Sequence, residues 1–432
     1  MRSRIVLLAL ACSWMLRGQD RNAIAALEEF TKICESEGQA IWGHSLCGPM
    51  MLVDPATRTV ISNHGDSQNR FRREGALFTG PFPEPFTPSN TAIQWDGQHW
   101  STVMLPLPLD PFRRLALLAH EAFHRIQPEL GLIGSDTPNE QLDTEDGRIW
   151  LRMELRAMGQ ALRMQDAIAR RAAADAMLFR MYRHNLFPGS AEREAAMERQ
   201  EGLAEYTGAV VALRTTGESV NREARIMESF EDSDAMARSF AYATGPGLGL
   251  LLDRFTQGWR SRVATTAMNS MLIWALKVPT QADLKRTAEE RAALYGYPAV
   301  VRAEQEREQR RADLASELNV KFLQGSVLDF PSSPEMNRNF NPMALTPFPP
   351  HGTYYPTGTF TAPWGKIQVD SGGALVTPDN RSVRVPVPSS FHPSDAPGAA
   401  IQGNGWALKL SPGWRIIPAR KAGSFLVVRA GP

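Results

Sequence analysis

Short runs of alternating hydrophobic and polar residues are frequent in the first hundred positions and predict β-strands joined by tight turns. Residues 50–53 and 58–61 are two such runs, separated by an Asp-Pro-Ala-Thr segment that favours a turn. Residues 92–95 and 98–105 form the clearest hairpin, because the Asp-Gly pair between them suits a type I′ turn. This part of the chain is therefore expected to build a small antiparallel sheet.

The pattern then changes to that of an amphipathic helix, in which hydrophobic residues recur every three or four positions. Asp110 and Pro111 supply an N-cap and a first-turn proline for this helix, and Pro128 ends it. Its apolar stripe consists of Leu115, Leu118, Ala119, Ala122, Phe123 and Ile126. Such a stripe packs against a core, so any polar residue that lies along it needs a partner.

Helical patterns continue to about residue 320. One helix is expected at 22–35 and a long one at 144–183, with Asp143 as its N-cap. Further on, proline, glycine and threonine become common, and short alternating runs predict strands.

This order of elements predicts an α+β protein with several parts. The expected parts are a leader at 1–18, a main domain at 19–325 with a β-rich part at 19–130 and a helical part at 131–325, a Pro-rich linker at 326–350 and a small all-β domain at 351–432.

The N-terminus resembles an export signal. A basic Met-Arg-Ser-Arg segment precedes an apolar run from Ile5 to Leu16, which is too short to span a bilayer. Cleavage before Cys12, as in a lipoprotein, and cleavage near Gly18 are both open. The pattern predicts a periplasmic or secreted protein, with no transmembrane span after the leader.

Cys34 and Cys47 are an even pair in such a compartment. A disulfide between them would contribute about 3 kcal/mol by loop entropy, with strain able to remove much of it. Two unrelated buried thiols are the alternative, and the spacing alone does not decide between them.

The composition of the 432 residues is that of an ordinary globular protein, with 43% apolar and 22% charged residues. Lys and Arg number 47 against 46 Asp and Glu, which gives a formal net charge of +1. This balance lacks the basic excess typical of nucleic-acid binding, so no nucleic-acid partner is expected.

His120, Glu121 and His124 form an H-E-x-x-H motif on the apolar stripe. Two histidines four positions apart lie one helical turn from each other, so both imidazoles reach one cation. The glutamate between them lies close enough to take a proton from water bound to that cation. The apolar flanks disfavour the alternative, a surface helix with two ordinary histidines. The motif therefore predicts a metal site, for which zinc (Zn2+) is the candidate ion, with Glu121 beside the metal-bound water.

A hydrolytic zinc site usually takes three protein ligands. The spacing of the metzincins is excluded, because Gln127 and Leu130 occupy the positions where that class has glycine and histidine. Glu201 is the best downstream candidate, and Gly202 beside it leaves room for another helix. Glu205, one helical turn later, is suited to accept the outer N–H of a ligand histidine.

Other carboxylates compete for the third position. The rivals are Glu198, Asp143 and Asp146. Asp143 is better explained as the N-cap of the long helix and Asp146 as its first-turn partner. Glu201 and Glu205 also have a plain structural explanation, as residues of an exposed amphipathic helix, but their pairing with the histidine motif favours the metal interpretation.

With the blocks His120–His124 and Glu201–Tyr206, the chain resembles the gluzincin metallopeptidases, the zincins whose third ligand is glutamate. A weaker block, Ala241–Gly245, is similar to a helix with tyrosine and glycine in that group. The resemblance implies a zincin-like catalytic domain with zinc on His120, His124 and Glu201, Glu121 as general base and Glu205 as the outer carboxylate.

The resemblance covers roughly residues 90–255 and says nothing of the C-terminal domain. Glu201 follows His124 by 77 positions, far more than in compact thermolysin-like members, so a helical insertion at about 144–193 must be accommodated. The segments 41–49 and 142–150 also resemble uncharacterised exported bacterial proteins.

Together these features predict an exported zinc metallopeptidase that acts on a peptide or protein. Tyr242 is preferred by family analogy as the donor that stabilises the oxyanion. Tyr206 and His184 are alternatives, although five positions from Glu201 turn Tyr206 about 140° away around the helix. The hairpin at 92–105 would offer an edge strand to an extended peptide.

Three other functions remain open on sequence alone. One is a catalytically silent binding or scaffold protein with a zincin fold. The second is a zinc amidohydrolase that acts on a non-peptide amide, and the third is an interaction protein without metal.

Overall fold

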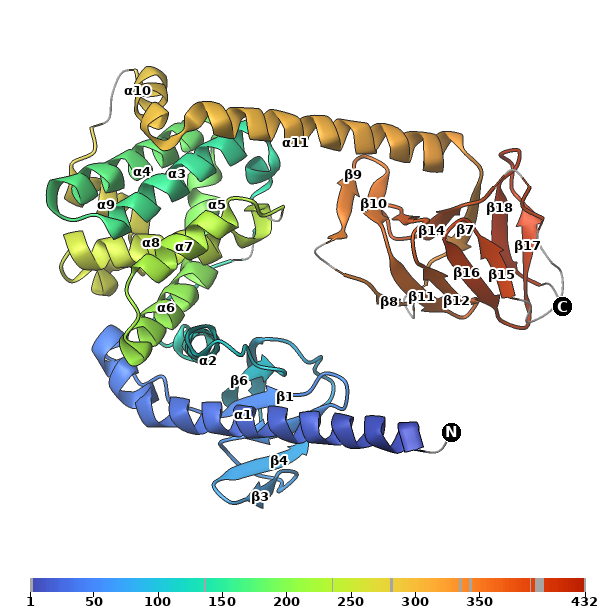
Figure 1. Ribbon diagram of the computed structural model, residues 1–432, viewed down its shortest axis with the longest axis horizontal. Helices are drawn as coiled ribbons and strands as arrows, with labels where there is room; N and C mark the ends of the chain where they lie inside the picture. Colours follow the sequence, from blue (N-terminus) through green and yellow to red (C-terminus); the bar gives the residue numbers. More distant parts are fainter. Residues whose placement is uncertain are drawn as a thin grey trace. The chain divides into compact units, whose positions relative to one another are not determined.

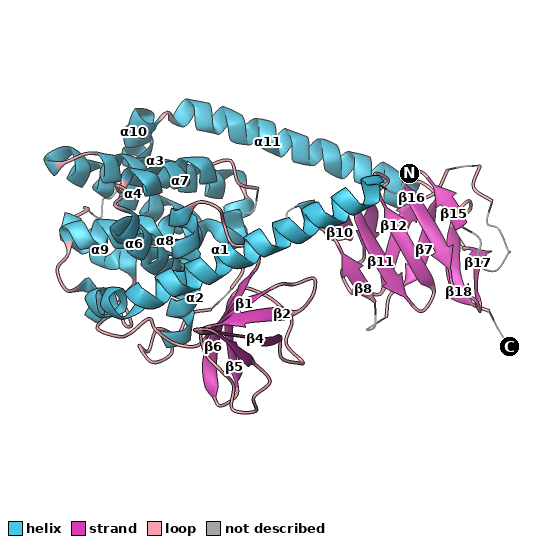
Figure 2. Ribbon diagram, turned by 60° about the horizontal axis from the view of Figure 1, so that its bottom comes forward, coloured by secondary structure: helices cyan, strands magenta, loops and turns pink. Residues whose placement is uncertain are grey.

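The computed structural model describes residues 3–135, 137–234, 236–279, 283–333, 336–341, 344–388, 390–392 and 400–430, with side chains from 21 onward except at 400. The chain forms two compact units that divide between Arg302 and Ala303. Helices dominate the middle of the chain, and strands form sheets near both ends (Figure 2). The protein is therefore a mixed α+β protein, as the sequence predicts.

A six-stranded sheet precedes the H-E-x-x-H helix. Its strands are β1 (Met50–Val53), β2 (Thr59–Ser62), β3 (Arg72–Glu74), β4 (Leu77–Pro81), β5 (Thr91–Trp95) and β6 (Gln98–Met104). Their order is β3-β4-β2-β1-β6-β5, and all neighbours are antiparallel except β1 and β6, which are parallel. The expectation of a purely antiparallel sheet is wrong, because four strands intervene between β1 and β6 and no tight turn makes these two run in opposite directions.

The predicted hairpin is present as β5 and β6. Asp96 and Gly97 have φ values of 50° and 78°, the left-handed conformation that a type I′ turn requires at both positions. Trp100 packs in the core on one face of the sheet, and Val103 belongs to the core shared with the helices. β5 pairs only with β6 among the described strands, so its outer edge is free.

The H-E-x-x-H helix is α2 (Pro111–Ile126), with the predicted start and end. The Asp110 carboxylate accepts hydrogen bonds from the backbone N–H groups of Phe112 and Arg113. Helix α2 lies between β6 and α6 (Leu203–Thr216) (Figure 1). Both of its faces are therefore covered, which explains why the motif residues are buried.

A helical region follows α2. Its helices are α3 (Glu145–Arg163), α4 (Asp166–Leu186), α5 (Ser190–Met197), α6, α7 (Asn221–Phe230), α8 (Met236–Phe255), α9 (Met268–Leu276), α10 (Leu284–Ala292) and α11 (Tyr297–Leu318), with short 3-10 turns η1 (Glu140–Asp143), η3 (Trp259–Arg262) and η4 (Ala293–Tyr295) and π-helical turns η2 (Glu198–Gly202) and η5 (Asn319–Gln324).

The single long helix that the sequence predicts here is wrong. The chain reverses between α3 and α4, where Asp166 has a positive φ of 49°, and the two helices pack against each other along their lengths. Thr144 rather than Asp143 caps α3, because the Thr144 side chain accepts a hydrogen bond from the backbone of Gly147. No glycine or proline marks the reversal, so the sequence pattern is continuous across it.

The second unit contains two sheets. Their strands are β7 (Val327–Pro331), β8 (Asn337–Asn339), β9 (Thr346–Phe348), β10 (Gly352–Tyr355), β11 (Gly358–Ala362), β12 (Gly365–Val369), β13 (Ala374–Val376), β14 (Ser382–Pro386), β15 (Ala400–Gly403), β16 (Trp406–Leu410), β17 (Trp414–Pro418) and β18 (Phe425–Arg429). The orders are β17-β18-β7-β14-β13-β10-β9 and β15-β16-β12-β11-β8, and both sheets contribute to one hydrophobic core.

The stretch expected to be a linker, 326–350, is part of these sheets. β7 pairs with β14 along its whole length, and β9 pairs with β10. Of the described prolines there, Pro331 ends β7, Pro347 lies in the edge strand β9, and Pro349 and Pro350 lie in a turn, all places where proline is compatible with a sheet.

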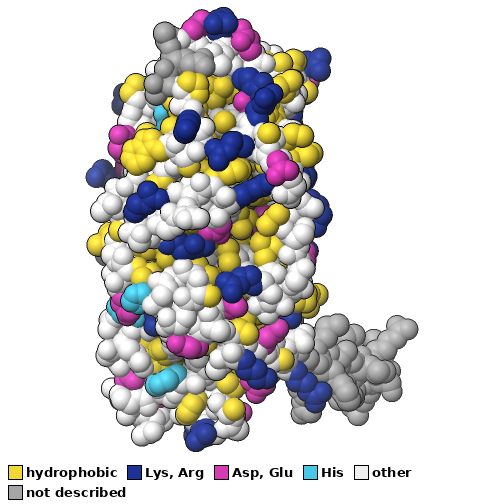
Figure 3. All heavy atoms as spheres, turned by 90° about the vertical axis from the view of Figure 1, so that its left-hand side faces the viewer, with side chains coloured by type: hydrophobic (Ala, Val, Ile, Leu, Met, Phe, Trp, Pro, Cys, Tyr) yellow, Lys and Arg dark blue, Asp and Glu magenta, His cyan; other side chains and the backbone are white. Residues whose placement is uncertain are grey.

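The N-terminal helix α1 (Ser3–Trp42) is longer than the segment predicted from the sequence. The expected leader at 1–18 lies outside the residues whose side chains are described. Of the described helices, none carries an apolar stretch of the length that crossing a bilayer needs. Cys34 and Cys47 form a disulfide, which decides the alternative that their spacing left open. On the face in Figure 3, basic, acidic and hydrophobic side chains are interspersed, as a net charge near zero suggests.

Candidate metal centre

The imidazoles of His120 and His124 and the carboxylate of Glu201 converge on one point. The Nε2 atoms of the two histidines are 3.0 Å apart. Oε2 of Glu201 lies 3.5 Å from Nε2 of His120 and 3.4 Å from Nε2 of His124.

These separations fit a zinc ion. A tetrahedral zinc ion with bonds of about 2.0–2.1 Å needs ligand atoms about 3.3 Å apart. The circle through the three donor atoms has a radius of about 1.9 Å, so a point about 2.0–2.1 Å from all of them lies slightly out of their plane. The three residues predicted from the sequence as ligands therefore form a suitable donor triangle.

A close helix crossing positions the first histidine. At Gly208 of α6 a Cβ would overlap the carbonyl oxygen of Ala116 in α2, so only glycine allows this approach. The crossing brings Glu205, one turn before Gly208, to His120, one turn after Ala116. Oε2 of Glu205 lies 2.7 Å from Nδ1 of His120, where the sequence interpretation expected an outer carboxylate.

The second histidine is oriented by Gln127, whose role the sequence interpretation missed. Oε1 of Gln127 lies 2.9 Å from Nδ1 of His124. Nε2 of Gln127 donates to the backbone carbonyls of Arg199 and Gln200, at 2.7 and 3.1 Å. One buried side chain thus links the histidine helix to the turn that carries Glu201.

The outer contacts fix the tautomers of both rings. Because Nε2 of Gln127 donates to two carbonyls, its Oε1 must face His124, so Nδ1 of His124 is the donor. The Glu205 carboxylate likewise accepts from Nδ1 of His120. In the neutral rings both Nε2 lone pairs therefore face the convergence point, which is the tautomer that binds a metal.

The candidate third ligand, Glu201, lies on the π-helical turn η2. Gly202 of this turn and Gly245 of α8 touch, and a Cβ on Gly245 would overlap the backbone of Gly202. This contact brings Tyr242, one turn before Gly245, to the metal centre. Its hydroxyl donates to Oε2 of Glu201 at 2.8 Å, and its ring stacks on that of His120 with 5.7 Å between centroids.

The charges of the site favour a cation at its centre. Burial lowers the pKa of His120, but the carboxylates of Glu201 and Glu205 outweigh burial and raise it to about 10. Burial raises the pKa of Glu201, but the two imidazoles and the Tyr242 hydroxyl outweigh it and hold this pKa below its ordinary value. A proton or a metal ion is thus stabilised between the imidazoles and the carboxylates.

Glu121 lies beside this point in a low-dielectric environment. It is 3% exposed, and its Oε2 has no hydrogen-bond partner among the described residues. Burial raises the pKa of Glu121, although the neighbouring His120 and His124 oppose the increase. The Ser101 hydroxyl on β6 donates to the backbone carbonyl of Glu121 and fixes this part of α2 against the sheet. A buried carboxylate with a raised pKa is suited to accept a proton.

A cavity of about 500 Å³ opens over the metal centre. It is lined by the metal-site residues, by Thr91 and Ala92 of β5 and by His99 of β6. Leu132 and Ile133, in the loop after α2, contribute apolar surface to its wall. The free edge of β5 therefore borders the cavity.

Three residues considered from the sequence lie elsewhere. The Tyr206 hydroxyl donates to Asp253 at 2.7 Å, away from the metal centre, because its position on α6 differs from that of Glu201 by more than a third of a turn. Nε2 of His184 lies 2.9 Å from a carboxylate oxygen of Glu194. Glu198, the rival candidate for the third ligand, is 1% exposed, and its carboxylate accepts hydrogen bonds from another buried side chain. Tyr242 is thus the tyrosine at the site, and Tyr206 and His184 are not oxyanion donors in this geometry.

Comparison of the chain with protein-family models, with curated proteins and with solved structures finds no match. Any assignment of function therefore depends on the geometry and chemistry of these side chains.

Proposed function

We propose that the protein is an exported zinc-dependent metallopeptidase of gluzincin type, with a zincin-like catalytic domain in its first unit. One observation carries the proposal: the Nε2 atoms of His120 and His124 and a Glu201 oxygen converge at separations that suit zinc. Next to them lies the buried Glu121, one oxygen of which has no partner among the described residues. This arrangement has the ligands, the open coordination position and the base that metal-assisted hydrolysis needs.

The residues of the chain supply the other parts of the chemistry. A bound zinc ion would polarise the scissile carbonyl and lower the pKa of the attacking water. Glu121 accepts the proton of that water and passes it to the leaving amine. The Tyr242 hydroxyl donates to Glu201 in the free protein, so it must turn from that carboxylate to donate its one proton to the oxyanion. It remains protonated because burial and the adjacent Glu201 raise its pKa.

The free edge of β5 gives a reason to favour a peptide substrate. Thr91 and Ala92 of this strand line the cavity, and the outer edge of β5 has no partner among the described strands. An extended peptide would pair with this edge and lie across the metal centre, in the manner of β-strand addition. A small non-peptide amide would not need such an edge.

Two features support export. The N-terminal residues have the charge and hydrophobicity of a leader. The disulfide between Cys34 and Cys47 is typical of a protein that folds in an oxidising compartment.

The decisive experiment combines zinc content with activity on a peptide library. We expect about one zinc per chain in protein purified without chelator, and Glu121→Gln should retain this zinc while activity falls about 10²–10⁴-fold. Glu129→Gln, on the exposed segment after α2, is the matched control and should change neither quantity.

The other outcomes separate the competing functions. Zinc bound without any hydrolysis indicates a scaffold protein, and hydrolysis of small amides alone indicates a non-peptide amidohydrolase. A wild-type protein that binds no zinc refutes the proposal and leaves an interaction protein without metal.

A further inference from the structure

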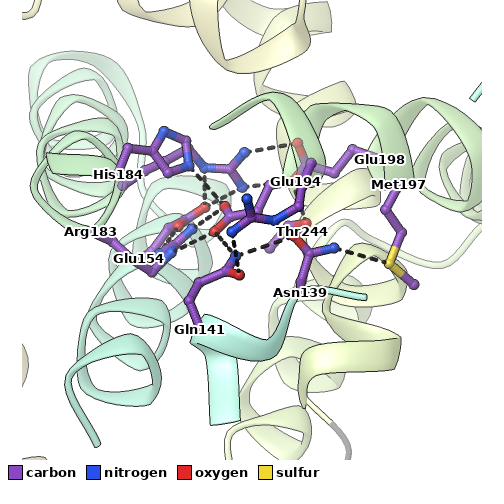
Figure 4. Close-up of polar contacts among 11 residues, drawn as sticks. Asn139, Gln141, Glu154, Arg183, His184, Glu194, Met197, Glu198 and Thr244 are labelled. Carbon is purple, nitrogen blue, oxygen red and sulfur yellow. Dashed lines mark hydrogen bonds and ion pairs between the residues drawn. The ribbon is translucent and has the colours of Figure 1, made fainter. Parts of the chain in front are cut away.

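A group of fully buried charged side chains contacts the π-helical turn η2, which carries Glu201, through Glu198 of the same turn. Its members are Glu154, Arg180, Arg183, Glu194 and Glu198, each at most 1% exposed. Figure 4 shows Glu154, Arg183, Glu194 and Glu198 with the neighbouring polar side chains of His184, Gln141 and Thr244. The group lies outside the cavity, so it does not contact a substrate there.

Glu198 is the member of this group that reaches the metal-binding turn. Arg180 binds both of its oxygens, with Nη1 2.8 Å from Oε2 and Nη2 2.7 Å from Oε1. The Thr244 hydroxyl donates to Oε1 of Glu198 at 2.6 Å. Arg180 is itself held by Glu154, whose Oε1 lies 2.8 Å from Nε and 2.6 Å from Nη2. Both the carboxylate and the guanidinium are thus fixed in direction.

Glu198 and Glu201 belong to the same π-helical turn, η2. The backbone N–H of Leu203 donates to the carbonyl of Glu198, five residues earlier, which is the π pattern. Glu198 reaches the buried group while Glu201 reaches α2, so one turn presents carboxylates to two different partners. A π turn differs from the regular helix and needs tertiary contacts to persist.

Helix α8 donates a hydrogen bond to each of the two carboxylates of this turn. Its Thr244 donates to Glu198, and its Tyr242, two residues earlier, donates to Glu201. The contact between Gly245 and the turn fixes the distance between α8 and η2. The positions of the two carboxylates are therefore coupled through α8 as well as through the turn.

Stability alone does not explain such a group. Burying ion pairs is often no more favourable than packing apolar side chains of the same size, whereas a well-ordered network fixes one geometry. We infer that Arg180 is a positioning residue for the metal ligand Glu201, acting through its bidentate contact with Glu198 and assisted by Thr244. This inference rests on the proposed zinc site.

The first test uses a mild substitution. Thr244→Val has nearly the same shape and removes one hydrogen bond to Glu198, while Thr244→Ser keeps the hydroxyl. We expect Thr244→Val to weaken zinc binding about tenfold and Thr244→Ser to restore it, as found for outer partners of metal ligands. Zinc affinity is measured by competition with a chelator, and the visible spectrum of the Co²⁺-substituted protein reports ligand geometry.

The second test compares two buried arginines on α4. Arg180→Met removes the contact with Glu198, whereas Arg183→Met removes contacts with Glu154 and Glu194 in the same group but none with Glu198. Both should unfold at lower temperature. Only Arg180→Met should weaken zinc binding, about 10–100-fold, and change the Co²⁺ spectrum of the folded protein.

The outcomes are separable from those of the proposed function. A wild-type protein without zinc affinity refutes the metal site itself and this inference with it. Tight zinc binding in the wild type, with unchanged affinity and Co²⁺ spectrum in Thr244→Val and Arg180→Met, overturns only the positioning role. Equal weakening by Arg183→Met and Arg180→Met also overturns it, because the effect would then reflect general loss of stability. If both arginine variants fail to fold, the two Thr244 variants decide.

Discussion

Replacing Gln127 by Met tests whether one amide side chain joins the two halves of the metal site. Methionine has a similar length but loses the acceptor for His124 and both donors to the carbonyls of Arg199 and Gln200. Loss of an outer partner typically weakens metal binding about 10–100-fold, which is about 1.4–2.7 kcal/mol. Loss of the two hydrogen bonds to these carbonyls adds about 1 kcal/mol each to the loss of folding stability.

Gln127→Glu separates these two roles. A carboxylate still accepts from Nδ1 of His124, so zinc affinity should fall less than in Gln127→Met. It cannot donate to the two carbonyls and places negative charge against their oxygens, so the free energy of unfolding should fall more. Gln39→Met, on an exposed part of α1, serves as the control.

The assay measures both quantities in each variant. Zinc affinity comes from chelator competition, and the free energy of unfolding comes from urea titration of the zinc-free protein. The reasoning is refuted if Gln127→Met binds zinc as tightly as the wild type, or if Gln127→Glu loses more zinc affinity than Gln127→Met.

Three further predictions concern stability. Burial raises the pKa of Glu223 to about 8, so the contribution of this carboxyl to stability is fully present below about pH 4.5 and is lost as the pH rises through 8. Glu223→Gln should therefore raise the free energy of unfolding by at most about 5 kcal/mol at pH 9 and by about zero at pH 4, whereas the same change at the exposed Glu228 should leave it unchanged at both pH values. Gly208→Ala should lower the free energy of unfolding by about 3 kcal/mol and weaken zinc binding, because the added Cβ overlaps the backbone of Ala116. In the same urea titration Gly159→Ala should raise the free energy of unfolding by about 0.5–1 kcal/mol, because its Cβ meets nothing closer than 3.6 Å. Replacing both cysteines of the disulfide by serine should cost about 3 kcal/mol, and addition of a thiol reductant should bring the wild type to the same value; equal stability with and without reductant would contradict this.

The residues that the sequence placed correctly at the site are those whose position follows from local periodicity. His120 and His124 are one turn apart on a helix whose apolar stripe and caps are visible in the sequence. Glu201 and Glu205 were found because their separation suits two roles at one metal. These two glutamates reach the histidines only because glycines allow the helices to cross closely. Of these glycines, the sequence pattern indicates only Gly202 as a close contact.

The features that were missed depend on tertiary contacts. Gln127 follows a helix end and has no pattern that distinguishes it from a surface glutamine. The reversal between α3 and α4 has no glycine or proline, and it is stabilised by the packing of the two helices on each other. Glu198 is consistent in sequence with a metal ligand, and only the buried Arg180 and Thr244 show that it has another role. The local sequence pattern therefore predicts the three side chains that converge, whereas the side chains that orient them required the fold.

The environment of Glu121 favours catalysis over a binding role for this site. Glu121 is 3% exposed, and one of its oxygens has no partner in the part of the chain that the structure describes. Such a carboxylate costs folding free energy, and a glutamine or an apolar residue there would reduce that cost. The candidate metal site does not need Glu121, since His120, His124 and Glu201 complete the donor triangle without it. A protein that used the metal only to hold its structure would gain stability by losing this side chain. In the proposed hydrolase this carboxylate would be the proton acceptor, so an oxygen of Glu121 without a partner among the described residues favours a hydrolase over a scaffold.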